Sequence, residues 1–230
     1  AANRGGKTIV KSGTPTTDTG IKKFGTSSLE LDGATDYLSV AANNDFGFGT
    51  SNYAIDGWFY ITNVGVTNYL FDFRGGAATD VAPVLYVNSS AQLKYYSYNA
   101  DRINGPTLLV NTWYHIAVSR SAGTTKLFVN GTSQGTPWVA ATDYGSAKPL
   151  VIGATWEGAS FYNGRIDEFR VTKGLARFDA NFVAPTSELA SDSYTKLMLH
   201  FNNAADGSST IIDDTLAAQD IRFSNGATAN

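Results

Sequence analysis

The feature that most constrains this chain is a two-residue alternation of apolar and polar side chains in short segments. These segments are rich in Tyr, Phe, Trp, Val, Ile and Thr, and Gly, Asn, Asp and Ser separate them. Because successive side chains of a strand point to opposite faces, this period predicts β-strands rather than helices. We expect strands over Ser28–Asp32, Tyr37–Val40, Tyr53–Ile61, Tyr69–Phe73, Val84–Val87, Leu93–Tyr98, Trp113–Arg120, Thr125–Val129, Leu150–Gly153, Gly164–Thr172 and Leu197–Phe201.

The connections between these segments favour antiparallel pairing. Dipeptides such as Asn130-Gly131 and Asn104-Gly105 predict tight turns, because Asn and Gly tolerate a positive φ. Parallel strands would need crossover helices, and no long helix is predicted. Leu175–Phe178 is expected to form one helical turn, and Asn181–Ser193 a connector. The sequence therefore predicts an all-β fold, a two-sheet antiparallel β-sandwich that buries the apolar strand faces.

Composition excludes several classes of protein. The 230 residues carry a net charge of -3, and only 16% of them are charged, against about 25% in an average domain. Without clustered Lys and Arg we expect no nucleic-acid binding, and 43% hydrophobic residues exclude a disordered chain. The absence of Cys excludes disulfides, thiolate metal sites and a cysteine nucleophile. No apolar run approaches the roughly 18 residues that span a bilayer, so we expect no membrane insertion.

Blocks of sequence follow one another in a recognisable order. They are Lys23–Leu29, Leu31–Gly33, Asp36–Val40, Phe46–Gly49, Gly57–Tyr60, Asn111–Val118, Lys126–Gly131 and Gly164–Val171. This order resembles the laminin-G-like, concanavalin A-like lectin/glucanase jelly-roll domains, over Lys23 to about Phe182. The resemblance implies the same jelly-roll β-sandwich.

Two further segments follow the last core strand. Lys173–Phe178 and Asn181–Thr186 resemble segments of the version of this domain that is repeated in bacteriophage tail and virion structural proteins. The resemblance implies a non-enzymatic structural or adhesion module on a virion surface or tail, which contacts other virion subunits and copies of itself and binds host-surface glycans. The alternative is a secreted or cell-surface bacterial carbohydrate-binding domain, which would be extracellular, and a minor alternative is a glycoside hydrolase.

The two ends of the chain concern domain organisation. The chain begins with Ala1, so we expect a mature or excised protein. Lys196–Asn202 resembles the opening of such a domain, although it lies near the C-terminus. We expect one sandwich over residues 1–201, closed by its own strand Leu197–Phe201, followed by a terminal segment over residues 202–230. Alternatively, that strand starts a further repeat.

Catalytic patterns are weak in this sequence. Glycoside hydrolases of this sandwich class place two carboxylates at alternating strand positions, so that both reach one glycosidic bond. Asp167 and Glu168 are adjacent, and a regular strand would point them to opposite faces. We expect His115 and His200 to be hydrogen-bonded structural residues. The sequence thus predicts a domain that is not an enzyme.

Aromatic residues provide the candidate ligand-binding site. Lys94, Tyr96 and Tyr98 share one face of a predicted strand. Further aromatic residues lie in or beside Gly-rich loops, and those chosen as candidates are Trp138, Tyr144, Trp156 and Tyr162. Flat rings cover sugar faces, and Tyr and Trp keep a polar group for hydroxyls. Exposed aromatic residues equally suit a protein interface, so both hypotheses stay open at this point.

Short acidic side chains suggest a cation site. The chain has 16 Asp and four Glu, and many of the Asp residues neighbour Gly, Asn or Thr. Asp in turns suits calcium coordination, and the resemblance implies calcium at a loop rim; the candidate ligands are Asp32, Asp36, Asp80 and Asp143. Asp is also the ordinary turn and capping residue, so a purely structural role is the alternative. No cofactor other than calcium is expected.

Overall fold

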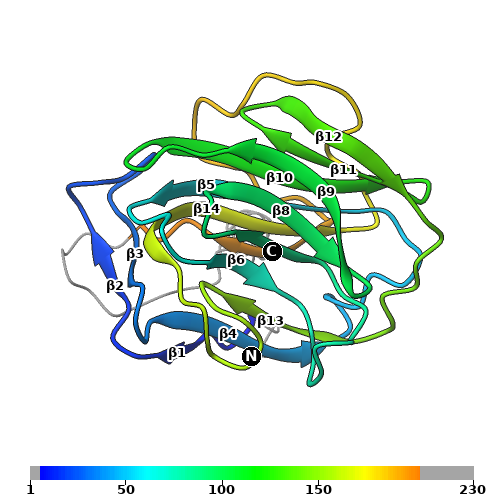
Figure 1. Ribbon diagram of the computed structural model, residues 1–230, viewed down its shortest axis with the longest axis horizontal. Helices are drawn as coiled ribbons and strands as arrows, with labels where there is room; N and C mark the ends of the chain where they lie inside the picture. Colours follow the sequence, from blue (N-terminus) through cyan, green and yellow to red (C-terminus); the bar gives the residue numbers. More distant parts are fainter. Residues whose placement is uncertain (1–5, 203–230) are drawn as a thin grey trace, which may run out of the picture.

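The computed structural model describes residues 6–202, which form two antiparallel sheets packed face to face (Figure 1). The predicted all-β sandwich is confirmed. Within this range no helix is long and apolar enough to cross a membrane. The strands in residues 6–202 are β1 (Val10–Ser12), β2 (Thr16–Asp18), β3 (Ser28–Asp32), β4 (Tyr37–Asn43), β5 (Tyr53–Ile61), β6 (Asn68–Asp72), β7 (Val84–Val87), β8 (Gln92–Ser97), β9 (Ala100–Thr107), β10 (Trp113–Ser121), β11 (Thr124–Val129), β12 (Thr132–Val139), β13 (Lys148–Ile152), β14 (Asn163–Lys173) and β15 (Thr195–Leu199).

The strands divide into two sheets. Sheet I has seven strands in the order β1-β4-β13-β6-β7-β8-β9. Sheet II has eight: seven follow the order β12-β11-β10-β5-β14-β3-β2, and β15 pairs with β14 beside this path. The edge strands β9 and β12 contact each other and bring the two sheets together along one side of the sandwich.

The core lies between the two sheets, where alternate side chains of each strand meet. In β8, Leu93 and Tyr95 are fully buried, whereas Lys94 and Tyr96 are only half-buried. The alternation predicted for this strand is therefore confirmed. The same rule places Phe59 of β5 and Leu85 of β7 in the core.

Four strands were not predicted, namely β1, β2, β9 and β12. They are edge strands, so they carry few buried apolar side chains, and β12 has no fully buried residue. Gly and Pro within β9 and β12 further weaken the strand signal. Asn104-Gly105 lies inside β9 and is not a turn, and Leu175–Phe178 forms no helical turn, so both predictions are wrong.

The connector between β14 and β15 covers the outer face of sheet II. We call residues 174–194 the strap; it begins in the gold segment of Figure 1. The rings of Phe178 and Phe182 stack with their centroids 4.2 Å apart, and both contact His115 and Phe128 of the sheet. An apolar layer thus closes this face of the sandwich.

A buried ion pair lies under the strap. Arg170 donates hydrogen bonds to both carboxylate oxygens of Asp56, at 3.0 and 2.8 Å, and a longer one to the strap carbonyl of Ala190 at 3.3 Å. His115 Nε2 lies 3.3 Å from Asp56 Oδ2. Burial raises the pKa of Asp56, but the neighbouring Arg170 and His115 outweigh it and lower the pKa overall. His115 is therefore a buried residue with a hydrogen-bonded structural role.

Asp167 and Glu168 do not point to opposite faces, which corrects the prediction. The register between β14 and β5 shifts between Asp167 and Arg170, and Glu168 has a φ of +55°. Such a β-bulge inserts an extra residue and interrupts the regular alternation of side chains. Glu168 Oε2 accepts a hydrogen bond of 2.6 Å from the strap N–H of Leu189.

Asp167 lies on this covered side as well. Its Oδ2 accepts hydrogen bonds from the backbone N–H groups of Lys23 and Phe24, and the Phe24 ring packs edge-on against Trp58. Asp167 and Glu168 are both 0% exposed, so neither carboxylate can reach a polysaccharide. His200 Nδ1 lies 2.8 Å from Glu168 Oε1, which gives His200 the structural contact expected of it.

The Asp167 carboxyl should make stability depend on pH. Burial, together with the nearby Glu168 carboxylate, raises its pKa from 3.8 to about 7, although three backbone N–H groups act in the opposite direction. Between about pH 4 and pH 7 the folded state therefore keeps a proton that the unfolded chain has released. The contribution of this carboxyl to stability is full below about pH 4 and is lost as the pH rises to about 7. Each unit of pKa difference corresponds to about 1.4 kcal/mol.

Asp167→Asn tests this expectation. The amide stays neutral at every pH. Between about pH 4 and pH 7 the free energy of unfolding of the natural protein should therefore fall relative to that of the variant, and above pH 7 the difference between the two should stay constant. Urea titrations at half-unit pH steps measure the difference. Parallel curves over the whole range would show that Asp167 titrates normally.

Candidate functional site

Two of the predicted ligand-binding residues lie in the core. Tyr144 is 1% exposed and Tyr162 is 0% exposed, so the prediction that they contact a ligand is wrong. The Tyr162 hydroxyl donates to the Arg165 carbonyl at 3.2 Å. The Tyr144 hydroxyl is hydrogen-bonded to that of Tyr95 at 2.8 Å. Their Gly-rich sequence surroundings gave no indication that the rings turn inward.

Lys94 and Tyr96 lie on the outer face of sheet I, as their alternation predicts. Lys94 Nζ donates to Asn104 Oδ1 at 2.5 Å, and the Arg74 guanidinium lies 5.6 Å from the Tyr96 ring. The neighbouring rings of Tyr69 and Tyr86 stack on each other at 5.2 Å. Side chains on this face thus contact one another.

Trp156 contacts a strand that carries none of the other candidates. It is half-buried in the loop between β13 and β14, and its backbone N–H donates to Asp72 Oδ2 at 3.1 Å. The structure therefore places Trp156 beside β6 and does not bring it to Trp138.

Tyr98 leaves the row of Lys94 and Tyr96, which corrects the prediction that the three share a face. Tyr98 and Asn99 have φ values of +49° and +60° and form the two-residue turn between β8 and β9. Positive φ at both central positions is the signature of a type I′ hairpin. The turn carries Tyr98, which is 60% exposed, to the end of the sandwich.

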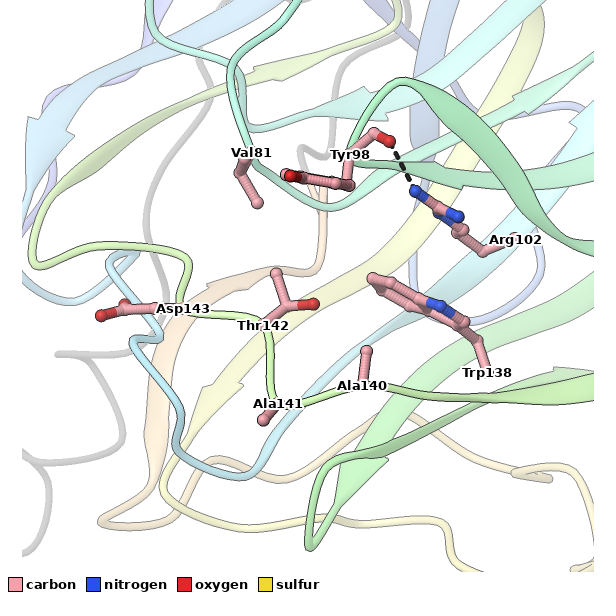
Figure 2. Close-up of a pocket in the computed structure, with 8 residues that line it drawn as sticks. All are labelled: Val81, Tyr98, Arg102, Trp138, Ala140, Ala141, Thr142 and Asp143. Atoms are coloured by element: carbon pink, nitrogen blue, oxygen red, sulfur yellow. Dashed lines mark hydrogen bonds between the residues drawn. The ribbon is translucent and has the colours of Figure 1, made fainter.

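At that end Tyr98 meets Trp138 of β12 across an open cleft of about 410 Å³. Figure 2 shows Tyr98 and Arg102 above the opening, Trp138 below them, and Thr142 and Ala140 along the opposite wall. The lining residues are Val81, Tyr98, Arg102, Trp138, Ala140, Ala141, Thr142 and Asp143. We call this site the end cleft.

Arg102 lies between the two aromatic residues. Its guanidinium carbon is 5.0 Å from the Trp138 ring and 5.7 Å from the Tyr98 ring. Its Nε and Nη2 donate to the carbonyls of Ser97 and Tyr98, at 2.8 and 2.5 Å. Sequence reasoning missed Arg102, because it enters the site through a register shift between β8 and β9 that alternation does not reveal.

The wall formed by residues 140–143 is held from behind. Arg120, which is 2% exposed, donates to the carbonyls of Thr142 and Gly49 at 2.7 and 3.3 Å. Tyr144 continues this anchor into the core through the hydroxyl of Tyr95, which in turn contacts that of Tyr53 at 2.9 Å. The end cleft is therefore supported by core contacts.

A glycine lets the two edge strands approach beside the cleft. Gly135 of β12 has a φ of +62°, and a Cβ there would lie 2.5 Å from the Asn104 carbonyl oxygen of β9. Only glycine avoids that contact without moving the backbone. The approach keeps Trp138 of β12 against Arg102 of β9.

The structure does not bring the four candidate calcium ligands together. Asp32 Oδ1 accepts hydrogen bonds from three backbone N–H groups of its own turn. Asp36 Oδ1 accepts one from the backbone N–H of Thr14 at 2.6 Å. Asp80 forms an ion pair with Lys148, and Asp143 accepts a backbone N–H within its loop. In residues 6–202 no three His, Asp or Glu side chains are grouped so as to hold a metal ion. Asp32 and Asp143 thus accept hydrogen bonds within their own turns, whereas Asp36 and Asp80 contact residues distant in the sequence.

Comparison with known proteins identifies the family. A family model described as the concanavalin A-like lectin/glucanases superfamily matches residues 32–176. The chain belongs to this superfamily. The matched region contains every residue of the end cleft. No curated protein matches the chain.

Solved structures show the same fold at low identity. A candidate carbohydrate-binding protein of Bacteroides ovatus has a TM-score of 0.59 and 16% identity, over 90% of this chain and 56% of that protein. Domain 4 of AbnA, an extracellular arabinanase of Geobacillus stearothermophilus, solved with arabinotriose, has a TM-score of 0.57 and 17% identity, over 74% of this chain and 82% of that domain. Botulinum neurotoxin type C has a TM-score of 0.53 and 14% identity, over 74% and 44%. The chain thus spans little more than half of the first relative and less than half of the third.

Two tyrosine-to-phenylalanine variants separate core from surface. Tyr144→Phe removes a buried hydroxyl and leaves Tyr95 with one partner fewer, so it should lower the free energy of unfolding by about 1 kcal/mol. Tyr98→Phe alters an exposed ring and should change it by less than about 0.5 kcal/mol. Urea denaturation compares the two. Equal losses would contradict the assignment of Tyr144 to the core and Tyr98 to the surface.

Proposed function

We propose that this superfamily member is a non-catalytic carbohydrate-binding domain and that the end cleft holds the sugar. The observation that carries this proposal is the exposed ring of Tyr98 and the half-buried ring of Trp138, on either side of the Arg102 guanidinium. The C–H faces of a pyranose or furanose ring bury well against such aromatic faces, and the polar groups between them bind hydroxyls.

The structural relatives support the proposal through what they are described as binding. The AbnA domain was solved with arabinotriose, and cell entry of the type C neurotoxin depends on two ganglioside molecules. The cleft itself adds a second argument, because its lining combines two aromatic rings with the small side chains of residues 140–142.

A catalytic role is not part of the proposal. Glycosidases use two carboxyl groups about 5 to 10 Å apart that flank the scissile bond. Among the residues lining the end cleft only Asp143 carries a carboxylate. The adjacent pair that the sequence offered, Asp167 and Glu168, is buried.

We propose an extracellular bacterial setting, which the arabinanase domain and the Bacteroides protein favour. A phage virion, in which the domain would contact other subunits and its own copies, is the second candidate. It rests on the resemblance of Lys173–Phe178 and Asn181–Thr186, which lie mainly in the strap, to phage segments. Antibody labelling of phage particles and of bacterial surfaces under the electron microscope discriminates between the two settings.

Substitutions in the cleft test the binding site. Trp138→Ala and Tyr98→Ala should each weaken polysaccharide binding about tenfold or more, since each removes a stacking ring; tenfold equals about 1.4 kcal/mol. Affinity electrophoresis against arabinan, polygalacturonate and dextran sulfate measures the effect, and the exposed Tyr98 allows a test that does not disturb the core.

Tyr96→Ala is the matched control, because it removes a tyrosine ring from the outer face of sheet I. It should leave binding unchanged. Loss of binding in Tyr96→Ala but not in Trp138→Ala would move the site to that face. Failure of every polysaccharide to bind, or shortening of a polysaccharide by the protein, would overturn the proposed function.

A further inference from the structure

We propose that the end cleft selects glycans bearing a carboxylate or sulfate group, and that Arg102 binds this anion. The inference deepens the proposed function and rests on it. It names the chemical class of the ligand and the residue that determines the selectivity.

Arg102 differs from the other arginines in residues 6–202. Four of them form ion pairs with a carboxylate at 2.6 to 2.8 Å, namely Arg74 with Asp72, Arg165 with Asp18, Arg170 with Asp56 and Arg177 with Asp192. Arg120 is buried and has no acidic partner among residues 6–202. Arg102 combines solvent access with a charge that no carboxylate of the described residues neutralises within 4 Å.

The guanidinium of Arg102 is held ready for a ligand. Two of its nitrogens donate to the carbonyls of Ser97 and Tyr98, which fixes its plane. Nη1 has no hydrogen-bond partner among the described residues, so both of its N–H groups are free to donate to an anion. Charge-assisted bonds of this kind are about twice as strong as neutral ones. A side chain that is already ordered loses little entropy when it binds.

The ring of Trp138 beside the guanidinium strengthens the interaction. It shields one side of Arg102 from water, and a lower local dielectric increases the attraction to an anion. The exposed ring of Tyr98, on the other side of the guanidinium, can stack on the sugar that carries the anionic group. One short region of the cleft can therefore contact both parts of an acidic sugar.

The acidic residues nearby do not cancel this charge. Asp101 accepts a hydrogen bond from Tyr86 on the outer face of sheet I and lies 4.0 Å from Lys94. Asp143, at the far end of the cleft, points away from Arg102 in Figure 2. With a net charge of -3, the protein as a whole does not attract anions, so the preference must come from this local arrangement.

Matched pairs of polysaccharides test the inference on the full chain. Polygalacturonate is compared with its carboxyl-reduced form, and dextran sulfate with dextran, which separates carboxylate from sulfate recognition. The natural protein should bind at least one acidic member about tenfold more tightly than its neutral counterpart. Arg102→Gln should bring that ratio close to one, because the acidic member should lose more affinity than the neutral member.

Lys22→Gln is the control for a change of net charge. Lys22 is exposed and follows β2, at the edge of sheet II opposite β12, and its loss should leave the ratio unchanged. Equal binding of acidic and neutral members, an equal loss for both in Arg102→Gln, or a fall of the ratio in Lys22→Gln would overturn the inference. If arabinan still binds in a Trp138-dependent manner, the proposed function survives that result; if no polysaccharide binds, both proposals fail.

Discussion

The arrangement of this domain depends on three tyrosine hydroxyls that meet inside the core. Tyr53 belongs to sheet II, Tyr95 to sheet I, and Tyr144 to the loop that follows β12, and their hydroxyls form a chain with distances of 2.9 and 2.8 Å. A buried hydroxyl without a partner is costly, so these contacts fix both sheets and the loop relative to one another. These hydrogen bonds also hold the wall of the end cleft in place.

The two outer faces of the sandwich are covered in different ways. The strap buries the outer face of sheet II under Phe178 and Phe182 and encloses a set of charged groups there. Side chains on the outer face of sheet I contact each other instead. The open hollow with free aromatic surface described above is at the end of the sandwich, where a turn and a loop face each other.

Alternation predicted β8 because burial on one face imposes a period of two there, whereas β5, β10 and β14 are buried on both faces over most of their length and were found from their apolar and aromatic residues. It could not predict β9 and β12, whose edge positions need no apolar face. Of the candidate site, Tyr98 and Trp138 were found from their residue types. Their partner Arg102 was not, because a register shift decides where it points, and Tyr144 was misplaced because a loop sequence does not show which ring turns inward. The prediction that Asp167 and Glu168 point to opposite faces was wrong for a related reason, because a β-bulge lies at Glu168.

The support of the cleft from behind has an evolutionary consequence. Arg120 and Tyr144 hold the backbone of the wall, whereas Ala140, Ala141 and Thr142 present short side chains toward the opening. Those front positions can be exchanged without disturbing the framework that holds the loop. A lineage of such domains can therefore diversify its recognition by point substitutions while keeping one rigid scaffold.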